Sequence, residues 1–206
     1  MKRELEEYFP QVFGKYYYDG DNEVIKEICS KIIDEIQPGH PEWNSNVAEE
    51  NLHHYFNISN SNLLRYDDRF KDFEKFLLDA ATDYFTDVLE YELNGSNLLI
   101  TDCWLNHCSK EHCWQKLHSP LDFYRPAKRE HAPSIAQLRQ PRIANEGNKY
   151  TKEVHQTKPQ EGCLFIWSAE TVHGYEGVFN LWKGRTTISM NFIPEILDNG
   201  KYAFRV

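Results

Sequence analysis

The sequence predicts an α+β protein whose helices buttress one face of a sheet or sandwich. Two observations support this class: helical periodicity is confined to the first 95 residues, and short β-type runs follow Gly95. With 206 residues, of which 40% are hydrophobic, the chain is long enough for one sizeable core and too short for two comfortable domains. We therefore predict a single domain over 1–206, with a mainly helical region over 1–95 and a β core over 96–206.

Two amphipathic helices are predicted before Gly95. In residues 21–37, apolar side chains recur at intervals of three and four, which is the period of one helix face. A second such pattern covers 67–93 and ends at Asn94-Gly95, which favours a left-handed helix stop. The residues predicted to point inward from this helix are Phe70, Phe73, Phe76, Leu77, Tyr84, Phe85, Val88 and Leu89. The Asn- and Ser-rich segment 44–62 lacks a clear period, so we predict a surface connection there.

The β half contains predicted strands at 98–106, 120–126, 149–157, 162–168 and 184–193. In the last of these, alternation places a wholly polar set on one face and a mostly apolar set on the other. The polar set is Arg185, Thr187, Ser189 and Asn191, and the opposite set is Thr186, Ile188, Met190 and Phe192. The polar face either meets solvent or lines a pocket for a charged ligand, because buried polar groups need hydrogen-bond partners. In such a pocket, Arg185 would bind a carboxylate through its planar fork, and Thr187 would add a hydrogen bond.

The charge and the cysteine content limit the classes of partner and compartment. The chain has 23 Lys and Arg against 32 Asp and Glu, a net charge of −9, which disfavours binding to nucleic acid or to anionic membrane surfaces. No apolar run approaches 18 residues, and the start MKRELEEYF is charged where a signal peptide is apolar. Five cysteines are an odd number for a disulfide framework, so reduced thiols are expected. We predict a cytoplasmic protein that does not associate with membranes.

The segment EGCLFIWSAETVHGYEGVFNLWKGRTTISMNF, residues 161–192, combines an apolar strand, a histidine after it and Arg-x-Thr on the next strand. It resembles the C-terminal half of the non-haem iron(II), 2-oxoglutarate-dependent oxygenases, especially the small prolyl-hydroxylase-like members of bacteria and phages. The resemblance covers about 98–194 and includes Trp104 and Asn106, where the family often has Trp-x-Asn. It implies a double-stranded β-helix, which is a jelly-roll, cupin-like fold, buttressed by the N-terminal helices.

The same resemblance implies a set of site residues and an activity. His173 is similar in position to the distal iron ligand, Arg185 to the arginine that binds the far carboxylate of 2-oxoglutarate, and Thr187 to its hydroxyl partner. Asn106 is expected to reach the inner end of this co-substrate. The implied activity is hydroxylation of an unknown substrate, either a peptide or protein side chain or a small molecule. It uses Fe(II), 2-oxoglutarate and molecular oxygen and releases succinate and carbon dioxide.

The other two iron ligands are expected at His118 and Asp122. His118 lies 55 residues before His173, which suits the ligand spacing of the family. The family has its second ligand two residues after this histidine, where this sequence has Pro120, and Asp122 is the nearest carboxylate. In an extended chain His118 and Asp122 would stand roughly 13 Å apart, so a shared metal requires the chain to turn at Pro120.

Two other functions fit the same sequence. One is a non-catalytic jelly-roll domain, kept for binding or assembly after losing part of the iron site. The other is a cupin-like metalloprotein that uses zinc or iron without 2-oxoglutarate. A zinc site in 103–118 is a further alternative, because this segment is dense in Cys and His, although it contains no Cys-x-x-Cys pair. Its candidate ligands are Cys103, His107, Cys108, His112, Cys113 and His118.

Overall fold

The computed structural model describes residues 12–36, 43–49, 52–57, 62–108, 160–168, 185–198 and 203–205. Its principal elements are β1 (Gly14–Tyr17), α1 (Asn22–Glu35), β2 (Trp43–Glu49), β3 (Leu52–Asn57), α2 (Lys71–Asp83), β4 (Leu98–Cys108), β5 (Cys163–Ile166), β6 (Arg185–Pro194), β7 (Ile196–Asp198) and β8 (Ala203–Arg205). A four-stranded sheet has the order β2-β3-β4-β6, and two smaller sheets pair β1 with β5 and β7 with β8. All of these pairings are antiparallel, so the predicted α+β class is confirmed.

The helix α1 begins at its predicted place because Asp21 caps it. Asp21 Oδ1 accepts hydrogen bonds from the backbone N–H groups of Glu23 (2.9 Å) and Val24 (3.3 Å), which would otherwise lack partners in the first turn. The predicted apolar stripe packs inward: Ile28 and Ile32 are fully buried. The three-and-four spacing therefore identified both the helix and its buried face.

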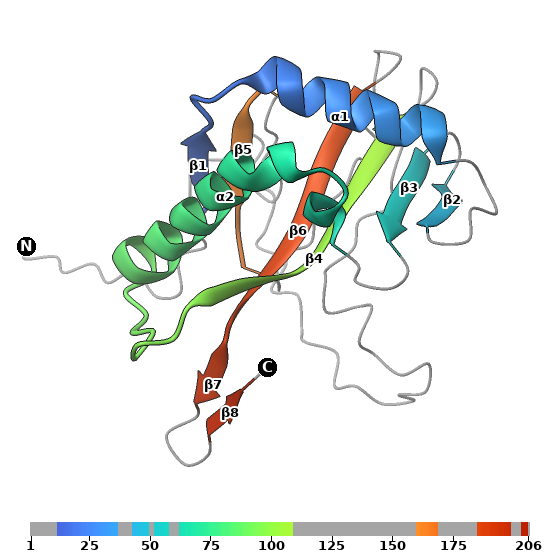
Figure 1. Ribbon diagram of the computed structural model, residues 1–206. Coiled ribbons are helices and arrows are strands. Elements are labelled where there is room, and N and C mark those ends of the chain that lie inside the picture. Colours follow the sequence, from blue (N-terminus) through green and yellow to red (C-terminus); the bar gives the residue numbers. More distant parts are fainter. Residues whose placement is uncertain are drawn as a thin grey trace, which may run out of the picture.

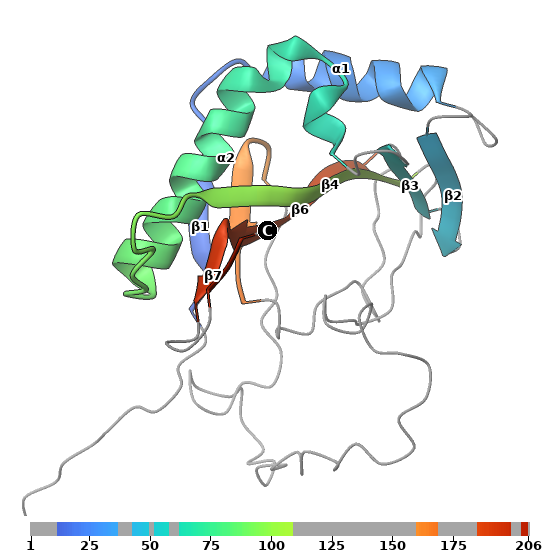
Figure 2. The ribbon, with the colours of Figure 1, turned by 60° about the horizontal axis from the view of Figure 1, so that its bottom comes forward.

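One core cluster joins α1, α2 and one face of the β4–β6 pair. Ile32 of α1, Leu77 of α2 and Leu105 of β4 are each at most 1% exposed. From β6, the residues that pack against this cluster are Ile188, Met190 and Phe192. Both helices lie on one side of the four-stranded sheet (Figure 1, Figure 2). We call this side of the sheet the helix side.

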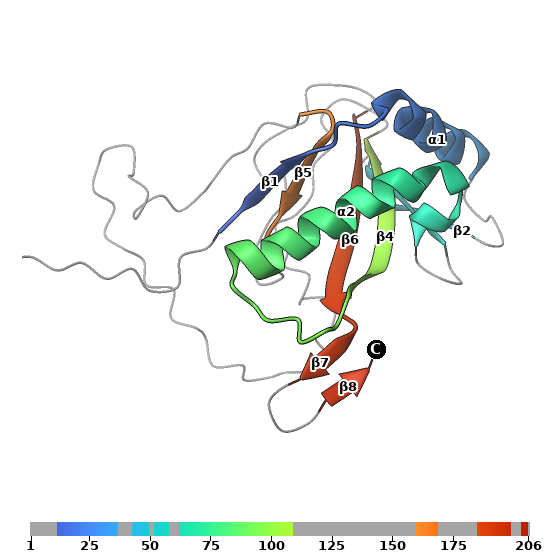
Figure 3. The same ribbon diagram turned by 60° about the vertical axis from the view of Figure 1, so that its left-hand side comes forward.

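A second core cluster connects α2 to two different sheets. Ala81 of α2 is fully buried in a cluster with Leu98 of β4 and Ile166 of β5. In Figure 3, α2 crosses in front of β4 and β6, and residues of β4, β5 and β6 pack in its cluster. The helix therefore packs on both the four-stranded sheet and the β1–β5 pair, which the predicted buttressing role requires.

The second predicted helix, 67–93, is shorter and less regular than expected. It starts with a 3₁₀ turn (Asp68–Phe70), continues as α2, and ends in a π turn (Tyr84–Val88). Glu90, with φ 56°, follows the last turn, whereas Asn94 and Gly95, with φ 49° and 77°, form a separate turn before β4. Of the residues predicted to point inward, Phe85 and Leu89 pack against the second core cluster, whereas Val88 is 38% exposed.

The prediction of a surface connection over 44–62 is wrong, because this segment contains most of β2 and all of β3. β3 pairs with β4, with Tyr55 opposite Leu105, and Tyr55 is only 6% exposed. β1 likewise pairs with β5. The region before β4 is therefore less purely helical than predicted. Strand formation here depends on partners distant in sequence, which local composition does not reveal.

A β-bulge at Thr101 determines which residues of β4 face the helices. Ile100 lies opposite Phe192 and Asp102 lies opposite Asn191, so β4 has one extra residue between two consecutive residues of β6. Before the bulge, Leu98 and Ile100 face the core, and after it Cys103 and Leu105 do so. Since alternation has period two, the extra residue turns Asp102, Trp104 and Asn106 away from the helix side.

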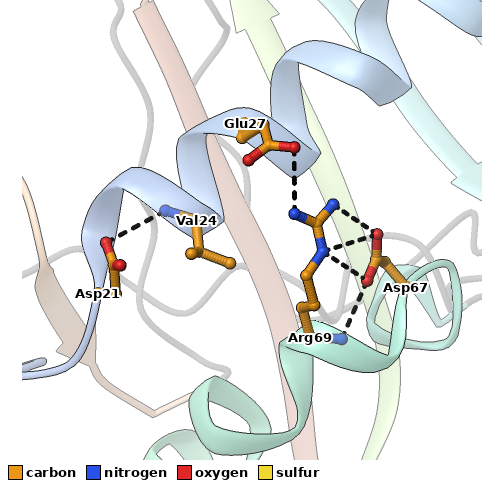
Figure 4. A network of polar contacts seen from close by, with 5 residues as sticks. All are labelled: Asp21, Val24, Glu27, Asp67 and Arg69. Carbon is orange, nitrogen blue, oxygen red and sulfur yellow. Dashed lines mark hydrogen bonds and ion pairs between the residues drawn. The ribbon is translucent and has the colours of Figure 1, made fainter.

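An ion-pair network ties α1 to the segment that leads into α2 (Figure 4). The Arg69 guanidinium donates to Glu27 Oε1 at 3.1 Å and to Asp67 Oδ2 at 2.9 Å. Asp67 Oδ1 also accepts a hydrogen bond from the backbone N–H of Arg69 at 3.0 Å, which caps the 3₁₀ turn. The bonds from the Arg69 guanidinium, and then that from its backbone N–H, lower the pKa of Asp67 from 3.8 to about 2.

Replacing Asp67 with asparagine keeps the cap but removes the charge that pairs with Arg69, so it is expected to lower the free energy of unfolding at pH 7 by up to about 1 kcal/mol. Because the folded-state pKa of Asp67 lies below its unfolded value of 3.8, its stabilisation is fully present above that value. The difference between wild type and variant should therefore shrink as the pH falls from about 4 towards 2. Urea unfolding at several pH values measures it.

The control for this experiment is Asp68→Asn. The Asp68 side chain is 90% exposed and pairs only with Lys71 of the adjoining turn among the described residues. Its substitution should change the free energy of unfolding by less than about 0.5 kcal/mol. An effect of Asp67→Asn that is equal to that of Asp68→Asn, or independent of pH, would contradict the role of Asp67.

Candidate functional site

The β4–β6 pair carries a continuous set of polar side chains on the side opposite the helices. Cross-strand neighbours are Asp102 and Asn191, Trp104 and Ser189, and Asn106 and Thr187, while Arg185 begins β6 opposite Cys108. We call this set the polar face; its members are Asp102, Trp104, Asn106, Arg185, Thr187, Ser189 and Asn191. All of them are half-buried. The alternation predicted for 184–193 is confirmed, because Ile188, Met190 and Phe192 pack into the core on the helix side.

Two hydrogen bonds orient the side-chain amide of Asn106. Trp104 Nε1 donates to Asn106 Oδ1 at 3.1 Å, and Asn106 Nδ2 donates to Ser189 Oγ at 2.7 Å. An indole nitrogen can only donate, so the amide oxygen must face Trp104 and the amide nitrogen must face Ser189. The amide has a second N–H, which these two contacts do not use. Asn106 is therefore held in one orientation with the capacity to donate to a ligand.

Arg185 and Thr187 lie on the polar face beside Asn106. Thr187 is directly opposite Asn106, where Cβ atoms of neighbouring strands stand about 4.5–5.5 Å apart. Arg185 precedes Thr187 by two residues, or roughly 7 Å along the strand. The Nε atom of Arg185 is shielded from solvent. A guanidinium, a hydroxyl and an amide N–H thus share one half-buried surface, and this donor set suits a carboxylate.

Asp102 marks the other end of the polar face. Its Oδ2 atom accepts a hydrogen bond from Thr101 Oγ1 at 2.9 Å and another from Asn191 Nδ2 at 3.2 Å. The motifs in the sequence did not single out this residue. The signal for it was its even spacing from Trp104 and Asn106, which places all three on one strand face. The face therefore has a cation at the start of β6 and a carboxylate near its far end.

The three predicted iron ligands, His118, Asp122 and His173, lie outside the described residues. The structure consequently brings together the residues predicted for the co-substrate, namely Arg185, Thr187 and Asn106, and leaves those predicted for the metal as predictions. Within the described ranges, no three His, Cys, Asp or Glu side chains gather closely enough to hold a metal ion.

The alternative zinc site loses one of its candidate ligands. Cys103 is fully buried in the core on the helix side, and this burial raises the pKa of its thiol. A zinc ligand must be a thiolate, which this apolar environment disfavours. His107 lies on the same side of the sheet, with Nδ1 at 3.0 Å from Thr186 Oγ1. Of the remaining candidates, His112, Cys113 and His118 lie outside the described residues.

An open depression of about 540 Å³ lies on the helix side, between α2 and the segment before α1. Its cationic residues are already engaged: Arg69 pairs with Asp67 and Glu27, and Lys75 pairs with Asp79. These pairs satisfy the charged groups with protein partners.

The described helices include none with both the length and the apolar character needed to cross a membrane. A scan against models of known protein families finds no match to this chain, and a search of curated proteins finds none either. A function for the chain is therefore inferred from its own residues and their arrangement.

Proposed function

We propose that this protein is an Fe(II)- and 2-oxoglutarate-dependent dioxygenase that hydroxylates a peptide or protein side chain or a small molecule. The observation that carries the proposal is the polar face, where the β4–β6 register brings Arg185, Thr187 and Asn106 together. In a chain of net charge −9, an anionic co-substrate needs such a local cationic site. The sequence spacing adds His173, 12 residues before Arg185.

The proposal includes the fold, a double-stranded β-helix of the jelly-roll, cupin-like type. Such a fold encloses a pocket between two sheets, and it needs one sheet that is apolar outward, beneath helices, and polar inward. The β4–β6 pair has this division: Leu105, Ile188 and Met190 face the helices, and the polar face points the other way. The predicted strands at 120–126 and 149–157 lie outside the described residues and would contribute to the second sheet.

Each residue of the donor set has a distinct role in binding 2-oxoglutarate. The Arg185 guanidinium would donate two parallel hydrogen bonds to the far carboxylate, and the Thr187 hydroxyl would donate a third. Asn106, held by Trp104 and Ser189, would direct its remaining N–H to the inner end. Strand pairing places the backbones of these residues, and the bonds with Trp104 and Ser189 hold the Asn106 amide, so this amide loses little conformational freedom on binding.

Iron would be held by His118, Asp122 and His173. Two histidines and one carboxylate are the donor set that binds Fe(II) on one face and leaves positions open for the oxoacid and oxygen. When bound, the metal supplies the oxygen chemistry, and the chain's residues position the co-substrate and exclude water.

Anaerobic titration of the protein with Fe(II) and 2-oxoglutarate tests the proposal. We expect a weak visible charge-transfer band that needs both additions, and succinate formation after air is admitted. The variant His173→Ala should lose the band, while either addition alone should not produce it. Absence of both the band and succinate would contradict the proposed oxygenase function.

The same experiment separates the alternatives. Calorimetric binding of 2-oxoglutarate that depends on Arg185 but yields no succinate would indicate a binding domain that has lost part of the iron site. Tight metal binding that 2-oxoglutarate does not alter would indicate a cupin-like metalloprotein. In the first outcome only the co-substrate site is intact, and in the second only the metal site is intact.

A further inference from the structure

We infer that Asp102 is the centre of a second subsite on the polar face, which binds a basic group of the substrate such as an ammonium or guanidinium. This inference rests on the proposed function, because it takes the Arg185 end of the face as the co-substrate end. It narrows the substrate to molecules that carry a cationic group at a distance from the reacting carbon.

The β-bulge puts Asp102 on the polar face. Without the extra residue at Thr101, the alternation of Leu98 and Ile100 would continue, and Asp102 would point into the core. A carboxylate there would be buried among apolar side chains at a high cost. Bulges often occur beside functional sites, where they redirect a side chain. Here the bulge redirects the one carboxylate of β4.

The bulge residue also holds the carboxylate in place. Thr101 Oγ1 lies 2.9 Å from Asp102 Oδ2 and 3.5 Å from the carbonyl oxygen of Asn191, and Asn191 Nδ2 donates to the same Oδ2 at 3.2 Å. Both donors to the carboxylate are neutral, so its negative charge is not cancelled by them. Within the described stretches of the chain, the hydrogen bonds to Asp102 all reach Oδ2. Oδ1 is therefore the atom that would accept a charge-assisted bond from a ligand.

Asp102 is placed to contact a group of the substrate, and it lies too far along β4 to contact the co-substrate. It lies four residues from Asn106 on the same strand, or about 14 Å along β4. 2-Oxoglutarate bound between Arg185 and Asn106 would not extend that far. Trp104 lies between them on the polar face, and its indole offers a surface for the alkyl part or the charge of a basic side chain. The net charge of −9 further favours the approach of a cationic substrate.

Binding of matched probes tests this subsite. The wild-type protein, loaded anaerobically with Fe(II) and 2-oxoglutarate, is titrated by calorimetry with Nα-acetyl-lysine amide and Nα-acetyl-arginine amide. Their neutral counterparts are Nα-acetyl-norleucine amide and Nα-acetyl-citrulline amide. We expect at least one basic probe to bind at least about tenfold more tightly than its neutral counterpart, the scale of one charge-assisted hydrogen bond.

The variant Asp102→Asn should abolish this preference, with the basic probe weakened by at least about tenfold. Asparagine preserves the shape and can still accept from Thr101, and an unchanged unfolding midpoint would show that the fold is intact. Asp68→Asn removes one exposed carboxylate elsewhere and should leave the preference unchanged. The proposed subsite is contradicted if no basic probe binds more tightly than its neutral counterpart, or if Asp102→Asn still binds the basic probe more tightly.

The outcomes for the subsite and for the oxygenase function are separable. A charge-transfer band with no Asp102-dependent preference would retain the oxygenase and overturn the subsite. An Asp102-dependent preference, measured in a protein that shows neither the band nor succinate formation, would support a site for basic groups and overturn the oxygenase.

Discussion

Replacing Arg185 with alanine is expected to weaken 2-oxoglutarate binding on the order of a hundredfold, because one partner of a half-buried, hydrogen-bonded charge pair is removed. The rest of the polar face remains, since Thr187 and Asn106 are positioned by strand pairing and by their own neighbours. Anaerobic titration with Fe(II), following either the charge-transfer band or the heat of binding, measures the change.

Two further variants sharpen this test. Arg185→Lys keeps the charge but loses the planar fork, so its affinity should lie between those of wild type and Arg185→Ala. Arg205→Ala removes an arginine whose side chain is 74% exposed and paired with Glu195, and it should bind 2-oxoglutarate as the wild type does. Equal binding by wild type and Arg185→Ala would show that the carboxylate lies elsewhere.

The largest expected effect on stability is that of Leu105→Ala, which should lower the free energy of unfolding by about 2–5 kcal/mol. Leu105 is fully buried on the helix side of β4, in the cluster that includes Ile32 and Leu77. Truncating it removes apolar contact and leaves a cavity that the surrounding strands and helices can only partly close. Urea unfolding at neutral pH, with the midpoint and slope fitted together, gives the value.

Ile196→Ala is the matched control for Leu105→Ala. Ile196 is also an aliphatic strand residue, but it is 37% exposed, so its truncation should cost less than about 1 kcal/mol. A cost for Leu105→Ala no greater than that of Ile196→Ala would mean that Leu105 does not face the core. The bulge at Thr101 and the orientation of Asp102 would then also be wrong.

Features with a local cause were predictable from the sequence. The apolar period of α1 depends only on residues within a few positions of one another, and the helix is found as expected; the structure adds Asp21 as its cap. The alternation in β6 is equally local, so the division between Arg185 and Thr187 on one face and Ile188 on the other could be read directly. In the same way, the sequence indicated strands close to β4 and β5.

Features that depend on distant partners were not predictable. The hairpin of β2 and β3 forms against β4, and the segment itself lacks a strong strand pattern. The second helix ends in a π turn at Val88, although its apolar pattern continues and Leu89 still packs against the second core cluster. In both cases the energy comes from burial and pairing between elements, which no local window contains.

For the candidate site, the residue types and their spacing along the chain already predicted the donors: an arginine, a threonine two residues later, and an asparagine two residues after a tryptophan. The folded arrangement brings these donors together, because the β4–β6 register places Asn106 opposite Thr187. It also decided that Asp102 joins them, since a single extra residue at Thr101 reverses which side of β4 faces the core. Strand register and bulges arise from long-range pairing, and so they become visible only when both strands are in place.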